Sequence, residues 1–195
     1  MNLLVVWLTA AMLAWSPPQP SKIGPESERY ATIARSVLDI AFDPVEKPLF
    51  AGMTGRAKTA LQILAIAGFE SNFREDVQYG TKRGKAGDAC LMQIIVPRSK
   101  TLRLNELSYE WIPAKSEERG FTADDLVGPD THSYFRADLH MVRESFQICG
   151  DLSMYTNGKC NHETKAKHRE MRAKQHYKMH PAPVSDAVAL SQGHS

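Results

Sequence analysis

Several features that mark common protein classes are absent from this 195-residue chain. The formal net charge is only +2, which by itself does not indicate a nucleic-acid partner. No CxxC or paired-histidine spacing indicates a metal site, and the glycine-rich segment 80–87 lacks the spacing of a phosphate-binding loop. We therefore expect no metal, no cofactor and no nucleic-acid binding. With 43% hydrophobic and 24% charged residues, the composition instead predicts one globular domain with appendages.

The apolar run at the start of the chain is too short for an ordinary membrane span. Residues 3–15 carry no charge, but a helix of this length extends about 20 Å, whereas a bilayer core is about 30 Å thick. Prolines follow it at positions 17, 18 and 20. The pattern predicts that residues 1–20 are an export signal, and hence a location in the periplasm or cell envelope. An uncleaved membrane anchor and a buried first helix are the alternatives.

Cysteine is scarce, with three residues in the whole chain: Cys90, Cys149 and Cys160. This number suits an oxidising compartment if two of them pair and one is left over. Cys149 and Cys160 are the natural pair, and closing a ring of this size would stabilise the fold by roughly 3 kcal/mol. Two reduced thiols are the alternative.

The apolar pattern predicts a mainly helical domain over residues 26–160. An amphipathic helix is expected over 28–42, and the segment 56–69 is apolar on almost every side, as in a helix buried through the middle of a domain. A second long helix is predicted over 130–149, where apolar side chains recur every three or four residues. The short apolar run 89–96 predicts either a strand or a buried turn.

Two segments are predicted to lie outside this core. Residues 98–120 are polar, and we interpret them as an insertion over the domain that carries Tyr109 and Trp111, two aromatic side chains that could stack on a sugar or be buried. From residue 161 onward the apolar signal ends, and residues 161–180 hold six lysines or arginines against two glutamates. We interpret residues 161–195 as a basic, histidine-rich and mobile tail.

Glu70 is the strongest candidate for chemistry. It follows the apolar segment 56–69 directly, where partial burial and the negative end of a helix dipole both disfavour a carboxylate anion. A carboxyl group that holds its proton in this way can act as a general acid, for example on the oxygen of a glycosidic bond. A solvated glutamate that ends a helix is the alternative.

Three separated segments, in order and with suitable spacing, carry a resemblance to a known family. They are 65–73 (AIAGFESNF), 87–94 (GDACLMQI) and 154–158 (MYTNG). The chain resembles the lytic transglycosylases with a lysozyme-like fold, which are related to goose-type lysozyme. Residues 122–130 also look like the family's connection into the helix before the tyrosine. The resemblance covers roughly residues 31–160 and implies an α+β lysozyme-like fold in a monomeric enzyme.

The resemblance implies that Glu70 is the single acid/base of a peptidoglycan lyase. Glu70 would protonate the β-1,4 bond between N-acetylmuramic acid and N-acetylglucosamine and then help the muramic 6-hydroxyl close on its own anomeric carbon. The product is a 1,6-anhydro sugar, so one carboxylate suffices where most glycosidases need two. The residues implied in binding the glycan strand are Ser71, Met92, Gln93, Tyr155, Thr156 and Asn157.

This sequence departs from the family pattern at two positions. Cys90 stands where the family usually has glycine, and Thr156 stands where it usually has asparagine, with Asn157 one place later. Two other functions remain open. A goose-type hydrolase would use Asp76 or Asp88 to position a water, and a wall-binding component would keep the groove without activity.

Overall fold

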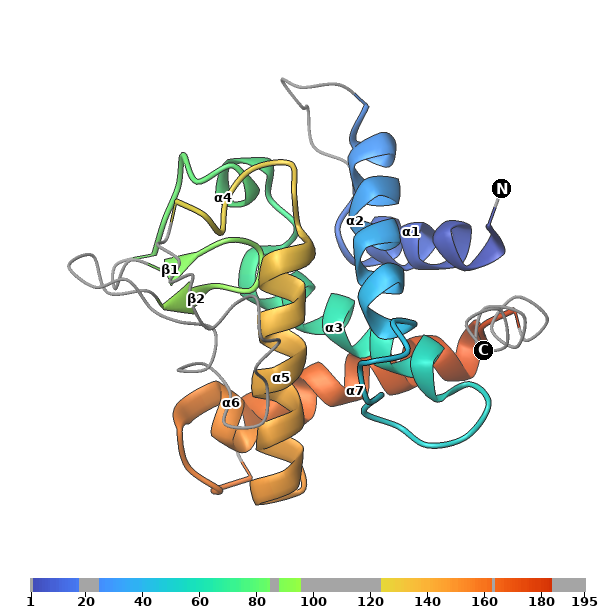
Figure 1. Ribbon diagram of the computed structural model, residues 1–195, viewed down its shortest axis with the longest axis vertical. Coiled ribbons are helices and arrows are strands. Elements are labelled where there is room, and N and C mark those ends of the chain that lie inside the picture. The colour runs from blue at the N-terminus through green and yellow to red at the C-terminus, as the bar shows by residue number, and fades with distance from the viewer. Residues whose placement is uncertain (1, 18–24, 85–87, 96–123, 163, 184–195) are drawn as a thin grey trace.

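A buried helix, α3 (Gly55–Ser71), runs through the centre of the protein, which we describe from a computed structural model (Figure 1). The structure describes residues 2–17, 25–84, 88–95, 124–162 and 164–183. The predicted buried helix is confirmed, and α3 is covered by α1, α2, α5 and α7 on its different sides. The fold is mainly helical, as predicted.

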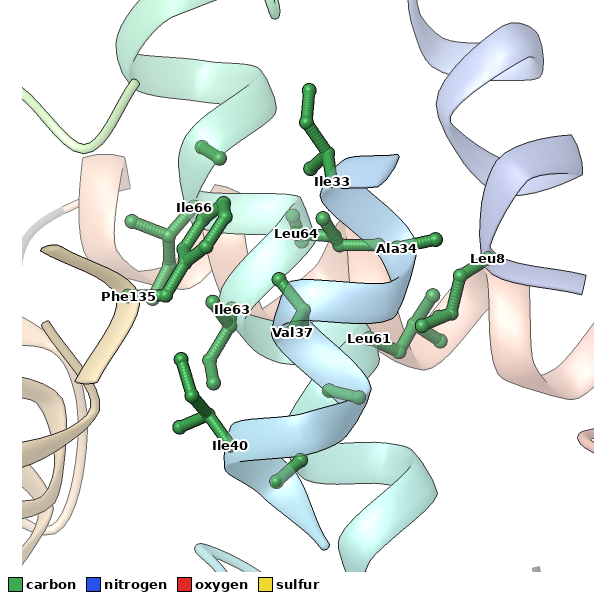
Figure 2. Packing of buried hydrophobic residues seen from close by; sticks show 14 of the residues in the cluster. Leu8, Ile33, Ala34, Val37, Ile40, Leu61, Ile63, Leu64, Ile66 and Phe135 are labelled. Atoms are coloured by element: carbon green, nitrogen blue, oxygen red, sulfur yellow. The ribbon is translucent and has the colours of Figure 1, made fainter. Parts of the chain in front are cut away.

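The core forms where α2 (Glu26–Ala41) crosses α3 (Figure 2). The amphipathic face of α2 meets α3 with branched side chains, and helix α5 (His132–Cys149) adds Phe135 from the other side. Burial of such side chains contributes about 1.5–3 kcal/mol each relative to exposure. The residues labelled in Figure 2 are Leu8, Ile33, Ala34, Val37, Ile40, Leu61, Ile63, Leu64, Ile66 and Phe135.

The apolar N-terminal run forms α1 (Leu3–Trp15), which packs against α2 and α3. Its inner side chains are buried, and the indole Nε1 of Trp7 donates a hydrogen bond of 2.9 Å to the carbonyl of His180. In the full chain α1 is therefore part of the core, the arrangement that the sequence offered as an alternative. Among the described residues, no helix is both long and apolar enough to cross a membrane. The export signal stays a prediction.

The short apolar run 89–96 contains a tight turn between two minimal strands. Strands β1 (Asp88–Ala89) and β2 (Ile94–Ile95) pair antiparallel, with Asp88 opposite Ile95. A short helix, α4 (Glu75–Gln78), precedes this hairpin. The predicted insertion at 98–120 lies outside the described residues.

A disulfide joins Cys149, the last residue of α5, to Cys160, the pair favoured from the sequence. The ring that it closes contains the short helix α6 (Ser153–Asn157). The middle of α5 makes polar contacts: the buried carboxylate of Glu46 accepts a hydrogen bond from Arg143 at 3.1 Å and lies 3.1 Å from the ring of His140. These contacts fix α5 and α6 relative to the centre of the fold.

The prediction of a mobile tail is wrong for residues 164–179, because they form helix α7 (Thr164–Met179), which packs along α3. Ala166 and Ala173 are buried at this contact and let the two helices approach closely. The other inward groups of α7 are mostly long cationic side chains, whose apolar stems cover surface while their charged ends find partners. Composition alone therefore suggested a solvated segment.

Candidate functional site

Glu70 lies in the last turn of α3, where the chain reverses direction. Asn72 and Phe73 both adopt left-handed backbone conformations, with φ of 52° and 51°, and the amide of Asn72 bonds to the carbonyl of Gly68 at 3.1 Å. The Ser71 hydroxyl donates to the carbonyl of Ala67 at 2.8 Å. Ser71, predicted to contact substrate, therefore uses its hydroxyl hydrogen within its own helix.

The carboxylate of Glu70 forms an ion pair with Arg169 of α7. Arg169 donates to Glu70 Oε1 from Nε at 3.0 Å and also from Nη2, so neither bond reaches Oε2. The side chain of Glu70 is 22% exposed and that of Arg169 is 12% exposed, so the pair is partly desolvated. Such charge-assisted bonds are stronger than neutral ones. The sequence predicted an apolar setting for Glu70 and gave no sign of this partner.

The turn of the β1–β2 hairpin holds two of the predicted site residues. Cys90 and Gln93 have φ of 59° and 51°, a left-handed conformation that favours glycine. A glycine at position 90 would adopt this conformation without the strain that the cysteine side chain introduces. The side-chain amide of Gln93 donates to the carbonyl of Cys90 at 2.9 Å, while Met92 is buried in the core. Gln93 therefore braces the turn.

Tyr155 of α6 contacts this hairpin and is influenced electrostatically by Glu70. Its hydroxyl donates to the carbonyl of Met92 at 3.4 Å, which brings the second and third sequence motifs into contact. Burial raises the pKa of Tyr155 well above its ordinary value, and the nearby carboxyl groups of Asp138 and Glu70 raise it further. Tyr155 and Glu70 are thus close enough to interact electrostatically, and Tyr155 is a neutral hydrogen-bonding group.

The side chains of the other two residues predicted in this motif form hydrogen bonds within residues 153–161. Thr156 donates its hydroxyl to the carbonyl of Ser153 at 3.2 Å. The Asn157 side chain donates to Asn161 at 2.8 Å and accepts from the amide of Lys159 at 2.9 Å. Both side chains stabilise the turn that leads to the disulfide, and neither has a hydrogen bond to Glu70 or Gln93 in the described part of the chain.

Asp138 of α5 is a further buried group at this site, which sequence reasoning missed. It is fully buried, and neither carboxyl oxygen has a hydrogen bond of ordinary geometry to the described residues. Burial raises its pKa well above the ordinary value, the Tyr155 hydroxyl beside it opposes that shift, and Glu70 adds to it. Asp138 is therefore a neutral acid behind Tyr155. Its place on the apolar stripe of α5, three residues after Phe135, was the signal available in the sequence.

The thiol of Cys90 is expected to be unreactive in the native protein. It is fully buried, and burial raises its pKa to about 12, so the reactive thiolate is scarce at neutral pH. A thiol-specific chromogenic reagent at pH 8 should detect no rapidly reacting thiol in the folded chain and one in denaturant without reductant. Rapid labelling of Cys90 in the native state would contradict the burial of this turn.

The arrangement comprises a partly exposed carboxylate, a fully buried aspartate and a partly buried tyrosine next to a hairpin turn. No group of three or more histidine, cysteine, aspartate or glutamate side chains suited to a metal ion occurs among the residues that the structure describes. Comparison with known protein families, curated proteins and solved structures finds no match to this chain. Its function is therefore inferred from the site itself.

Proposed function

We propose that this protein is a peptidoglycan lytic transglycosylase with a lysozyme-like fold that uses Glu70 as its acid/base. The observation that supports this most strongly is the convergence of the three resembling segments. Glu70 ends the buried helix, Tyr155 interacts with it electrostatically, and the Tyr155 hydroxyl contacts the backbone of Met92. These segments are separated in sequence, so the contact of the second with the third and the electrostatic influence of Glu70 on Tyr155 support a common site.

In the proposed reaction, Glu70 gives its proton to the oxygen of the bond between N-acetylmuramic acid and N-acetylglucosamine. The resulting carboxylate then takes the proton of the muramic 6-hydroxyl as that oxygen bonds to the anomeric carbon. Breaking one carbon–oxygen bond and forming another returns the proton to Glu70, and no water is consumed. Asp138 is fully buried and cannot position a water on the far face of the sugar, so an inverting hydrolase would have to use Asp76 or Asp88, of which Asp76 is paired with Arg74.

The ion pair between Arg169 and Glu70 has to weaken during this cycle. A carboxylate that is ion-paired to a guanidinium cannot protonate a leaving group, so Glu70 must be protonated when it acts. Both Arg169 bonds end on Oε1, which leaves Oε2 as the oxygen that can meet the glycosidic oxygen. We propose that substrate binding breaks the Glu70–Arg169 ion pair and leaves Glu70 protonated.

The apolar N-terminal segment and the Cys149–Cys160 disulfide support a site of action in the cell envelope.

Mass analysis of muropeptides tests this proposal. Purified peptidoglycan digested with the protein should yield strands that end in 1,6-anhydro-N-acetylmuramic acid, each lighter by one water molecule than the product of hydrolysis. Products with reducing ends and no anhydro ends would identify a goose-type hydrolase instead. Binding to the wall without any product would identify a wall-binding component.

A further inference from the structure

A groove of about 310 Å³ lies where α7 packs along α3 (Figure 1). Its floor is apolar, because Leu61 of α3 and Ala173 of α7 are both buried there. Phe50, from the segment before α3, and Tyr177 of α7 add two aromatic rings to its walls. The volume lies in the range of sites that hold small ligands, which are usually lined by apolar and aromatic side chains.

Three lysines also line this groove, and no aspartate or glutamate of the described chain does. They are Lys58, Lys174 and Lys178, of which the two on α7 are exposed and so stand at its opening. The Lys58 ammonium lies 5.0 Å from the ring centre of Tyr177, which holds that charge at the groove wall. Among the described residues, the one carboxylate paired with these lysines is Glu170, at 3.8 Å from Lys174. The opening of the groove therefore carries an excess of positive charge.

A buried amide adds hydrogen-bonding capacity to the floor. Gln62 lines the groove one turn after Lys58 on α3, and it is only 1% exposed. Its Nε2 donates to the carbonyl of Arg169 at 3.4 Å, and no second hydrogen bond to the described residues engages this side chain. An amide has two N–H donors and a carbonyl acceptor, and buried polar groups usually have partners. Gln62 is therefore available to a polar group that enters the groove.

We propose that this groove binds a small anionic amphiphile, a short alkyl chain that ends in a carboxylate. The alkyl chain covers the apolar floor, and the lysines and the amide of Gln62 bind the carboxylate. An inorganic anion would leave the floor in contact with water, and an uncharged hydrocarbon would leave the lysines without a partner. The inference is independent of the proposed lyase function, since neither Glu70 nor Arg169 lines the groove.

Titration calorimetry with the full-length chain tests this assignment. The probes share one alkyl chain and differ in charge: octanoate, octanol and octyltrimethylammonium, each kept at concentrations where it is monomeric. Octanoate should bind most tightly and octyltrimethylammonium least, because the lysines attract the first and repel the last. Octanoate should also raise the midpoint of thermal unfolding, since it binds the folded chain. Equal affinity for the three probes would overturn the proposal, because apolar contact alone would then account for binding.

Substitutions in the groove locate the bound octanoate. Lys58→Gln combined with Lys178→Gln should weaken octanoate binding by about tenfold and leave octanol binding unchanged. Gln62→Met keeps the length of the side chain without its amide and should weaken octanoate binding by about three- to tenfold. Lys167→Gln is the matched control, since Lys167 is exposed on α7 and does not line the groove. Unchanged octanoate affinity in the double lysine variant would overturn the proposal, because the probe would then bind elsewhere.

Sedimentation with lipid vesicles separates a free amphiphile from a membrane surface as the partner of these lysines. Vesicles of phosphatidylglycerol should carry down little more protein than vesicles of phosphatidylcholine. Strong binding to phosphatidylglycerol vesicles by a chain that does not bind octanoate would overturn the proposal and assign the lysines to an anionic membrane surface.

Discussion

Replacement of Glu70 by glutamine is expected to reduce wall cleavage by about 10²- to 10⁴-fold, the range that a general acid or base contributes. Glutamine keeps the shape of the side chain and an oxygen that can accept from Arg169, but it has no proton to give to the glycosidic oxygen. The same group is needed twice in the proposed cycle, so both steps fail together. Release of soluble muropeptides from purified sacculi measures the effect.

The matched control for this experiment is Glu28→Gln. Glu28 is an exposed glutamate in the first turn of α2, far along the chain from the site, and its removal should leave the cleavage rate unchanged. Thermal unfolding of Glu28→Gln should stay close to that of the wild type, because a surface-charge change contributes little. Glu70→Gln should unfold at a somewhat lower temperature, because it leaves the mostly buried Arg169 without its counter-charge. Undiminished cleavage by a folded Glu70→Gln protein would rule out Glu70 as the acid/base.

The second large effect concerns stability. Asp138→Asn should raise the free energy of unfolding at pH 7 by about 1–3 kcal/mol, because the wild-type chain must bind a proton at this carboxyl group when it folds and asparagine needs none. Burial raises the pKa of Asp138 in the folded state well above that of the unfolded chain, so folding takes up a proton at neutral pH. The penalty grows as the pH rises above the unfolded pKa and disappears in acid, where both states are protonated. Asparagine has no such penalty.

Urea unfolding at two pH values tests how the effect of Asp138→Asn on the free energy of unfolding depends on pH. The stabilisation by Asp138→Asn should be clear at pH 7 and should shrink toward zero near pH 3, below the unfolded pKa of about 3.9. Asp39→Asn is the control, because Asp39 is exposed and contacts only the ring of His132 among the hydrogen bonds that the structure gives it. A loss of stability at pH 7 in Asp138→Asn would mean that the folded protein holds this group as a carboxylate.

The helical frame was predictable from the sequence because its signals are local. Residues 56–69 are apolar all round, and only burial on every side satisfies such a pattern, as α3 confirms. Helix α7 was not predictable in the same way. Its inward groups are alanines and arginines, and the partners that make this face favourable, Phe69 and Glu70, lie about a hundred residues earlier in the chain.

The candidate site likewise has residues with a local sequence signal and residues whose contacts form only across the fold. Glu70 and Tyr155 were chosen because each lies in a contiguous motif, and their roles stay predictions; the structure adds that the Tyr155 hydroxyl bonds to the carbonyl of Met92 in the second motif. Arg169 could not be predicted, since an ion pair across the fold leaves no local pattern. Thr156 and Asn157 were assigned by position in a motif, but their side chains have nearer partners in the turn before the disulfide.

Helix α1 lies near the start of the chain and helix α7 near its end, and the two are in contact. The indole of Trp7 bonds to the backbone of His180, and the rings of Trp7 and Trp15 lie beside that of His176. If export removes α1, the mature protein loses the two tryptophan rings. Arg172 then loses its contact with Trp15 and keeps the one with Phe69. Removal of this segment would then expose the side of α7 that carries Arg172 and His176.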